Sequence, residues 1–263
     1  MANSFTAKDV QSLRQLTGAG MLDCKRALEE TEGDVNAASK LLRERGKSAV
    51  VKRSERQAGQ GAVAMVVDGA GALVELRCET DFVAKSPEFV GLVQDLASLV
   101  VAKGADAAAE RNSDVEALAI SLKENITLGR VVFFQPADGS VVDGYLHVQS
   151  DRGVNGVLVE LSGGTQSLAH DIAVHVAFAR PTYLSRDEVP PDEVAAERAT
   201  FETIARNEGK PAAAMAKIVD GRMNGWFKDR CLLEQDWVRD EKQTITKILG
   251  DARITRFAQV SVA

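Results

Sequence analysis

The residues that could carry chemistry are few and far apart in this sequence. His170 and His175 are separated by 175 − 170 = 5 positions, so they do not share one helical face as two zinc-binding histidines of an HExxH helix do. The other histidine and the cysteines, none of them in a CxxC pair, are His147, Cys24, Cys78 and Cys231. Structural zinc sites need closely spaced ligands. We therefore expect no metal and no other cofactor.

Cys78 is the strongest candidate for a nucleophile, but its surroundings favour a structural role. It closes the apolar run 72–78, and a free cysteine in such a run behaves as a small buried hydrophobe. The sequence contains no GxxxxGK[ST] loop and no GxGxxG after a predicted strand, so a nucleotide-binding loop is not expected. Carboxylates are numerous without an identifiable pair. These features favour a binding protein over a hydrolytic or redox enzyme.

Composition and charge describe an ordinary globular chain. It has 263 residues, 45% of them hydrophobic, with 32 Lys+Arg against 38 Asp+Glu and a formal charge of −6. This composition excludes wholesale disorder and disfavours a strongly basic nucleic-acid binder. The sparse cysteines fit a reducing compartment. The N-terminus lacks the features of a secretory signal, and the longest nearly apolar stretch, 89–102, falls short of a membrane span. We expect a cytoplasmic protein without a membrane partner.

Residues 1–46 are predicted to form a bundle of three short helices. Thr6 and Asp9 have the spacing of a capping box before the first helix, and Asp34 is a suitable N-cap for the third. Gly46 is placed to end that third helix. Three amphipathic helices in so short a span make a compact bundle with a small core.

A basic segment follows, with 47–60 predicted as a linker. Residues 40–60 hold seven basic and two acidic residues, a charge of 7 − 2 = +5. One interpretation is contact with an acidic surface or RNA. The other is a solvated helix end and linker. We favour the second, because no aromatic residues are interleaved to stack on bases, and expect no direct nucleic-acid partner.

The remaining chain alternates strand and helix patterns. Two apolar runs around Asp68-Gly69 predict a β-hairpin, and Ser86-Pro87 marks the start of an amphipathic helix. Further strands are predicted at 131–134, 141–148, 154–161 and 253–262, and helices at 114–124, 166–180 and 244–249. Two helical patterns flank Gly209-Lys210-Pro211. We predict an α+β fold with antiparallel sheets, core subdomains 61–140 and 141–263, and a projecting helical hairpin inserted at about 192–225.

Two segments resemble signatures of the bacterial elongation factor Ts family. They read LRQLTGAGMLDCKRAL at 13–28 and ELRCETDFVAK at 75–85. Weaker similarities, including Glu124-Asn125-Ile126, extend the resemblance over nearly the whole chain. The chain departs from the family pattern at Arg77, where Asn is usual, and at Gly129, where Arg is frequent.

The resemblance implies a guanine-nucleotide exchange factor. We expect such a factor not to be an enzyme, because exchange needs no covalent chemistry. Its partner would be elongation factor Tu, in the GDP-bound and nucleotide-free forms, and its N-terminal domain would be ubiquitin-associated-like. The segment Thr80-Asp81-Phe82-Val83 would enter the GTPase domain and disturb its magnesium and phosphate contacts. Further partner contacts implied by the resemblance are Arg14, Met21, Leu22, Lys25, Ile126 and His147.

Spacing alone supports plainer roles for several of these residues. Asp81 would cap a helix and Phe82 would pack inside, since phenylalanine is more often buried than exposed. Met21 fits the apolar stripe of its helix, and His147 fits a solvent-facing strand position. The alternative function is a non-catalytic, protein-binding adaptor built on the three-helix domain. The sequence leaves a homodimer open.

Overall fold

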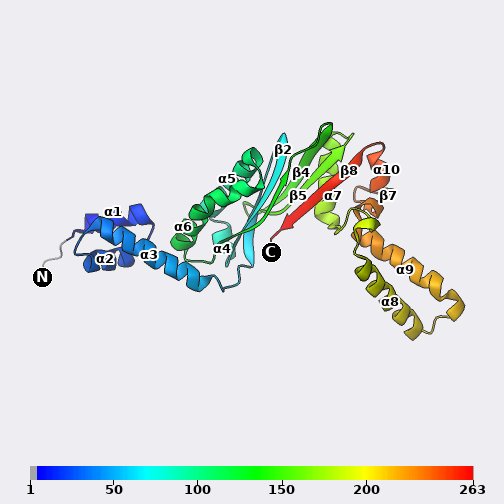
Figure 1. Cartoon of the computed structure of the whole chain (residues 1–263), viewed down its shortest axis with the longest axis horizontal. Helices are drawn as coiled ribbons and strands as arrows, with labels where there is room; N and C mark the ends of the chain where they lie inside the picture. The colour runs from blue at the N-terminus through cyan, green and yellow to red at the C-terminus, as the bar shows by residue number, and fades with distance from the viewer. Residues whose placement is uncertain (1–4, 263) are drawn as a thin grey trace.

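The computed structural model describes residues 5–262. Figure 1 shows an elongated molecule with a helical domain at one end, a β-rich core and a helical hairpin at the other end. The α-helices are α1 (Ala7–Thr17), α2 (Met21–Glu30), α3 (Val35–Arg53), α4 (Asp81–Ala84), α5 (Pro87–Lys103), α6 (Asn112–Leu122), α7 (Gln166–Ala179), α8 (Pro191–Asn207), α9 (Met215–Arg230) and α10 (Ile245–Leu249). The strands are β1 (Gln60–Asp68), β2 (Ala70–Cys78), β3 (Thr127–Phe134), β4 (Ser140–Gln149), β5 (Arg152–Ser162), β6 (Asp236–Trp237), β7 (Asp240–Thr244) and β8 (Arg253–Ser261). The predicted α+β class is confirmed.

The N-terminal bundle forms from the signals that the sequence carries. The backbone N–H of Thr6 donates to Asp9 Oδ2 at 2.7 Å, and the Asp9 N–H donates back to Thr6 Oγ1 at 3.3 Å. The Asp34 carboxylate caps α3, and Gly18 ends α1 in the left-handed region at φ 67°. The small core consists of Val10, Leu13, Cys24, Ala27, Leu28, Ala38 and Leu42. These caps and this core confirm the three predicted helices.

The predicted end of α3 at Gly46 is wrong. The helix continues to Arg53, so residues 47–53 of the expected linker are helical. A Cβ at position 46 would lie 2.7 Å from Cγ2 of Ile120 on α6. Glycine at this position therefore lets α6 approach α3 closely. In the sequence, a glycine required for such packing looks the same as a glycine that ends a helix.

The core has four layers, with two antiparallel sheets packed face to face between helices. One sheet has the order β1-β2-β3 and the other β4-β5-β8. The side chains between the sheets are Val63, Leu73, Phe134, Val142, Leu158, Ala258 and Val260. Helices α5 and α6 cover the outer face of the first sheet, and α7 covers that of the second (Figure 1). This arrangement confirms the predicted antiparallel sheets and gives each sheet a buried inner and outer face.

The helical hairpin and a small β-hairpin complete the chain. Helices α8 and α9 project from the core and are joined around Lys210-Pro211 (Figure 1). The apolar cluster at their base includes Val219, Met223, Trp226 and Phe227. Strands β6 and β7 pair antiparallel and were not predicted. Among residues 5–262, no helix is both long and apolar enough to cross a membrane.

Candidate functional site

The segment Thr80–Val83 forms a short, well-capped turn at the end of the first sheet. Strand β2 ends at Cys78, and Thr80 is the N-cap of α4, with its hydroxyl accepting from the Val83 N–H at 3.3 Å. Ala84 is fully buried, and Val83 packs against the core between the first sheet and α5. Phe82 points away from this anchor and is 82% exposed. The prediction from spacing alone that Phe82 packs inside is wrong.

The loop after α6 holds this turn in place through Glu124. Its carboxylate accepts from the backbone N–H groups of Glu79 and Thr80, at 3.0 and 3.1 Å. The Thr80 hydroxyl donates to the same carboxylate at 2.5 Å. In return, the N–H of Asn125 donates to Glu79 Oε1 at 2.7 Å. Charge-assisted bonds of this kind are stronger than neutral ones, so the turn is rigidly positioned before any partner arrives.

The Asp81 carboxylate already forms an ion pair within the chain. Lys85 Nζ lies 2.7 Å from Asp81 Oδ2, in the i, i+4 arrangement of a helix. The hydrogen bond from Lys85 lowers the pKa of Asp81 below its ordinary value. Both side chains are partly exposed, and such pairs exchange partners at little cost. The Asp81 carboxylate is therefore charged and available to a competing donor.

A second exposed surface lies on the N-terminal bundle. Arg14, Met21, Leu22 and Lys25 line one groove of about 790 Å³ between α1 and α2. Met21 and Leu22 are 57% and 59% exposed. The prediction that Met21 belongs to the buried stripe of its helix is wrong, because Met21 is the first residue of α2 and its side chain is mostly exposed. The four residues predicted from the first signature thus share one surface.

The two remaining predicted contacts differ from each other. His147 is exposed on β4, with Nδ1 3.4 Å from the Tyr145 hydroxyl. Ile126 is only 5% exposed and packs in the core beneath the first sheet. Its predicted contact with the partner therefore stays a prediction that the unbound structure does not favour. The residues before it, Glu124 and Asn125, are the ones that hold the Phe82 turn.

Comparison with known proteins points to one family. The family model for elongation factor TS matches residues 79–263. The chain belongs to the elongation factor Ts family. It is 46% identical over 97% of its length to elongation factor Ts of Kineococcus radiotolerans, covering 98% of that protein. It is 46% identical to that of Mycobacterium tuberculosis and 44% identical to that of Clavibacter michiganensis, each over 100% of this chain and 99% of the relative.

The two departures from the family pattern noted in the sequence meet at one buried carboxylate. Glu75 is almost fully buried on β2 and accepts from Arg77 Nε at 2.7 Å and from the Arg130 N–H at 2.9 Å. A Cβ at Gly129 would collide with this carboxylate. Arg77 supplies a counter-charge to Glu75, and glycine at 129 leaves room for it. The two departures are therefore structurally coupled.

The cysteines and the buried histidine do not form a reactive site. Burial raises the pKa of the Cys78 thiol to about 12, which confirms its predicted structural role. His175 is fully buried, and its Nδ1 accepts from the Val238 N–H at 3.3 Å, so Nε2 carries the proton toward Gln235 Oε1 at 3.0 Å. Within residues 5–262, no group of three or more potential ligands could hold a metal ion.

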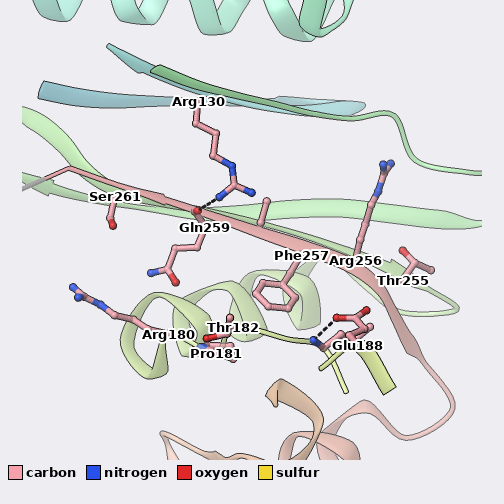
Figure 2. Close-up of a pocket in the computed structure, with 12 residues that line it drawn as sticks. Arg130, Arg180, Pro181, Thr182, Glu188, Thr255, Arg256, Phe257, Gln259 and Ser261 are labelled. Carbon is pink, nitrogen blue, oxygen red and sulfur yellow. Dashed lines mark hydrogen bonds between the residues drawn. The ribbon is translucent and has the colours of Figure 1, made fainter. Parts of the chain in front are cut away.

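A polar groove of about 400 Å³ runs beside β8, between this strand and the loop after α7 (Figure 2). Arg130 Nη1 donates to the Gln259 carbonyl at 3.0 Å, and Arg256 pairs with Glu160 at 2.5 Å. The Glu188 carboxylate accepts from the Leu184 N–H at 2.7 Å. No histidine or cysteine is among its described lining residues. The exposed Phe82 turn and the N-terminal surface remain the candidate site.

Proposed function

We propose that this member of the family is a guanine-nucleotide exchange factor for elongation factor Tu. It binds the GDP-bound form, promotes GDP release, and acts through Thr80-Asp81-Phe82-Val83. The observation that carries the proposal is the exposure of Phe82, at 82% the highest among the large hydrophobic side chains described. A rigid exposed aromatic residue is a typical anchor for a protein partner.

Exchange of this kind requires differential binding and no covalent step. A factor that weakens GDP binding a hundredfold must gain about 2.7 kcal/mol more on the empty GTPase than on the filled one. The coupling is reciprocal, so bound GDP weakens the binding of the factor to the GTPase by the same free energy. Fully burying an exposed phenylalanine side chain contributes about 1.5–3 kcal/mol. If Phe82 docks fully only on the empty GTPase, its burial supplies most of the required difference.

Asp81 and the N-terminal surface have separate roles in this proposal. On docking, the Asp81 carboxylate leaves Lys85 and competes for donors near the magnesium site of the partner. The surface formed by Arg14, Met21, Leu22 and Lys25 adds a second contact on the GTPase domain. His147 on β4 is a third proposed contact.

The test is the release of a fluorescent GDP analogue from purified elongation factor Tu, chased with excess GDP. We expect release to accelerate in proportion to the concentration of this protein until saturation. Release at the same rate with and without the protein would overturn the proposal.

The adaptor function is the second candidate, and the N-terminal groove favours it. This groove of about 790 Å³ is lined by Phe5, Val10, Met21 and Leu22, which suit an apolar ligand segment. Capture of elongation factor Tu on the immobilised protein separates the two functions. An exchange factor releases its partner when GDP is added, whereas an adaptor retains it.

A further inference from the structure

A basic groove of about 650 Å³ lies between α2, α3 and the end of α6, away from Phe82 and outside the function proposed above. Six cationic side chains line it together with a single carboxylate, that of Asp23. The cations are Arg26, Arg45, Lys52, Arg53, Arg56 and Lys123. Since the whole chain carries a charge of −6, this is a marked local reversal of sign.

Several of these charges have partners that a ligand can replace. Arg45 pairs with Glu30 at 2.5 Å, and Lys123 with the Asp23 carboxylate at 3.2 Å. These side chains are about half exposed. Exposed ion pairs contribute little to stability, so their cations remain available to an anion that enters the groove.

Arg53 is the exception, because it is buried without a counter-charge. It is only 8% exposed, yet within residues 5–262 its side chain makes a single hydrogen bond, from Nε to the Ala49 carbonyl at 3.0 Å, and no ion pair. A guanidinium is always charged, and burying a charge without a counter-charge destabilises a protein. Arg53 therefore has unused donors at a groove that contains no free anion.

The shape of the charge distribution indicates an extended ligand. Arg45, Lys52 and Arg53 follow one face of α3, and eight residues of helix span about 12 Å. The groove offers donors almost exclusively, since its single carboxylate already accepts from Lys123. The N–H groups of a peptide backbone would find no acceptors in this groove. The phosphate oxygens of a phosphodiester backbone, by contrast, can accept hydrogen bonds from the guanidinium groups along it.

We propose that this groove binds the phosphate backbone of single-stranded RNA without sequence preference. No aromatic side chain is among the described residues that line it, so bases are not stacked or read. Composition alone does not show that Arg53 is buried, and this burial is what favours the RNA interpretation of the basic segment 40–60.

The test is fluorescence anisotropy of a labelled oligouridine RNA titrated with the full chain at increasing KCl. We expect saturable binding at low salt, weakening with a slope of about −2 in log–log form if three phosphates are neutralised. Arg53→Met removes the charge but keeps the length of the side chain. It should weaken binding at least about tenfold while leaving the melting temperature unchanged or higher.

Two further variants keep the test decisive. Lys217→Gln changes the net charge equally on the distant helix α9 and should bind like the wild type. Arg26→Gln/Lys52→Gln removes two exposed groove charges, and weaker RNA binding by it supports the site even if Arg53→Met does not fold. The proposal is overturned by absence of RNA binding at low salt, or by equal loss in Lys217→Gln. Binding of a labelled glutamate-rich peptide but not RNA would also overturn it, and would identify an acidic protein segment as the occupant.

Discussion

Replacing Phe82 with alanine should separate partner exchange from folding. A fully buried phenylalanine hides about 150–250 Å², and Phe82 hides only about a fifth of that because it is 82% exposed. At about 25 cal/mol per Å², Phe82→Ala should cost less than about 1.5 kcal/mol of stability. Phe89 is fully buried, and Phe89→Ala should cost about 3–5 kcal/mol. A pair of thermal melts therefore distinguishes an exposed anchor from a core residue.

The same substitution should slow GDP release from elongation factor Tu at least about tenfold, which corresponds to about 1.4 kcal/mol. Stopped-flow release of fluorescent GDP measures this directly, over a range of factor concentrations. Ile204→Ala, on the exposed side of α8, is the matched control and should exchange like the wild type. A folded Phe82→Ala protein with the wild-type exchange rate would refute the assignment, as would a loss of stability as large as that of Phe89→Ala.

Three other outcomes follow from the contacts described above. Glu124→Gln should weaken the bonds that hold the Phe82 turn, lowering stability by about 1–2 kcal/mol and slowing exchange; melting and exchange assays measure both, and unchanged values would contradict the bracing role. Burial lowers the pKa of His175 below its unfolded value of 6.5, so stability should fall as pH drops below about 6.5; thermal melts of wild type and His175→Gln across pH 5–8 test this, with a smaller acid loss expected in the variant. Gly129→Ala should cost about 1–3 kcal/mol in urea unfolding because its Cβ collides with Glu75, and an unchanged midpoint would show that Glu75 can move freely.

Local signals in the sequence predicted most of the elements. The capping box at Thr6, the cap at Asp34 and the Ser86-Pro87 helix start are all present in the structure, because caps depend on residues close together in the chain. Features that depend on tertiary contacts were missed. Gly46 looked like a helix end because the approach of Ile120 is invisible in sequence. Strand β6 has only two residues and β7 is polar throughout, so neither shows apolar periodicity.

The site was predictable only in part for the same reason. Spacing gave Phe82 the wrong environment, and the family resemblance, not periodicity, drew attention to it. Glu124 lies 44 residues from Thr80, and nothing in the sequence shows that it reaches back to hold the turn. Ile126 shows that a segment can resemble a family motif while its side chain packs in the core.

The central claim is that this protein and GDP oppose each other on elongation factor Tu. Isothermal titration of the partner, first free of nucleotide and then with saturating GDP and magnesium, measures that opposition. We predict a Kd at least about a hundredfold higher with GDP, equivalent to about 2.7 kcal/mol of coupling. Equal affinity in the two titrations would contradict the account.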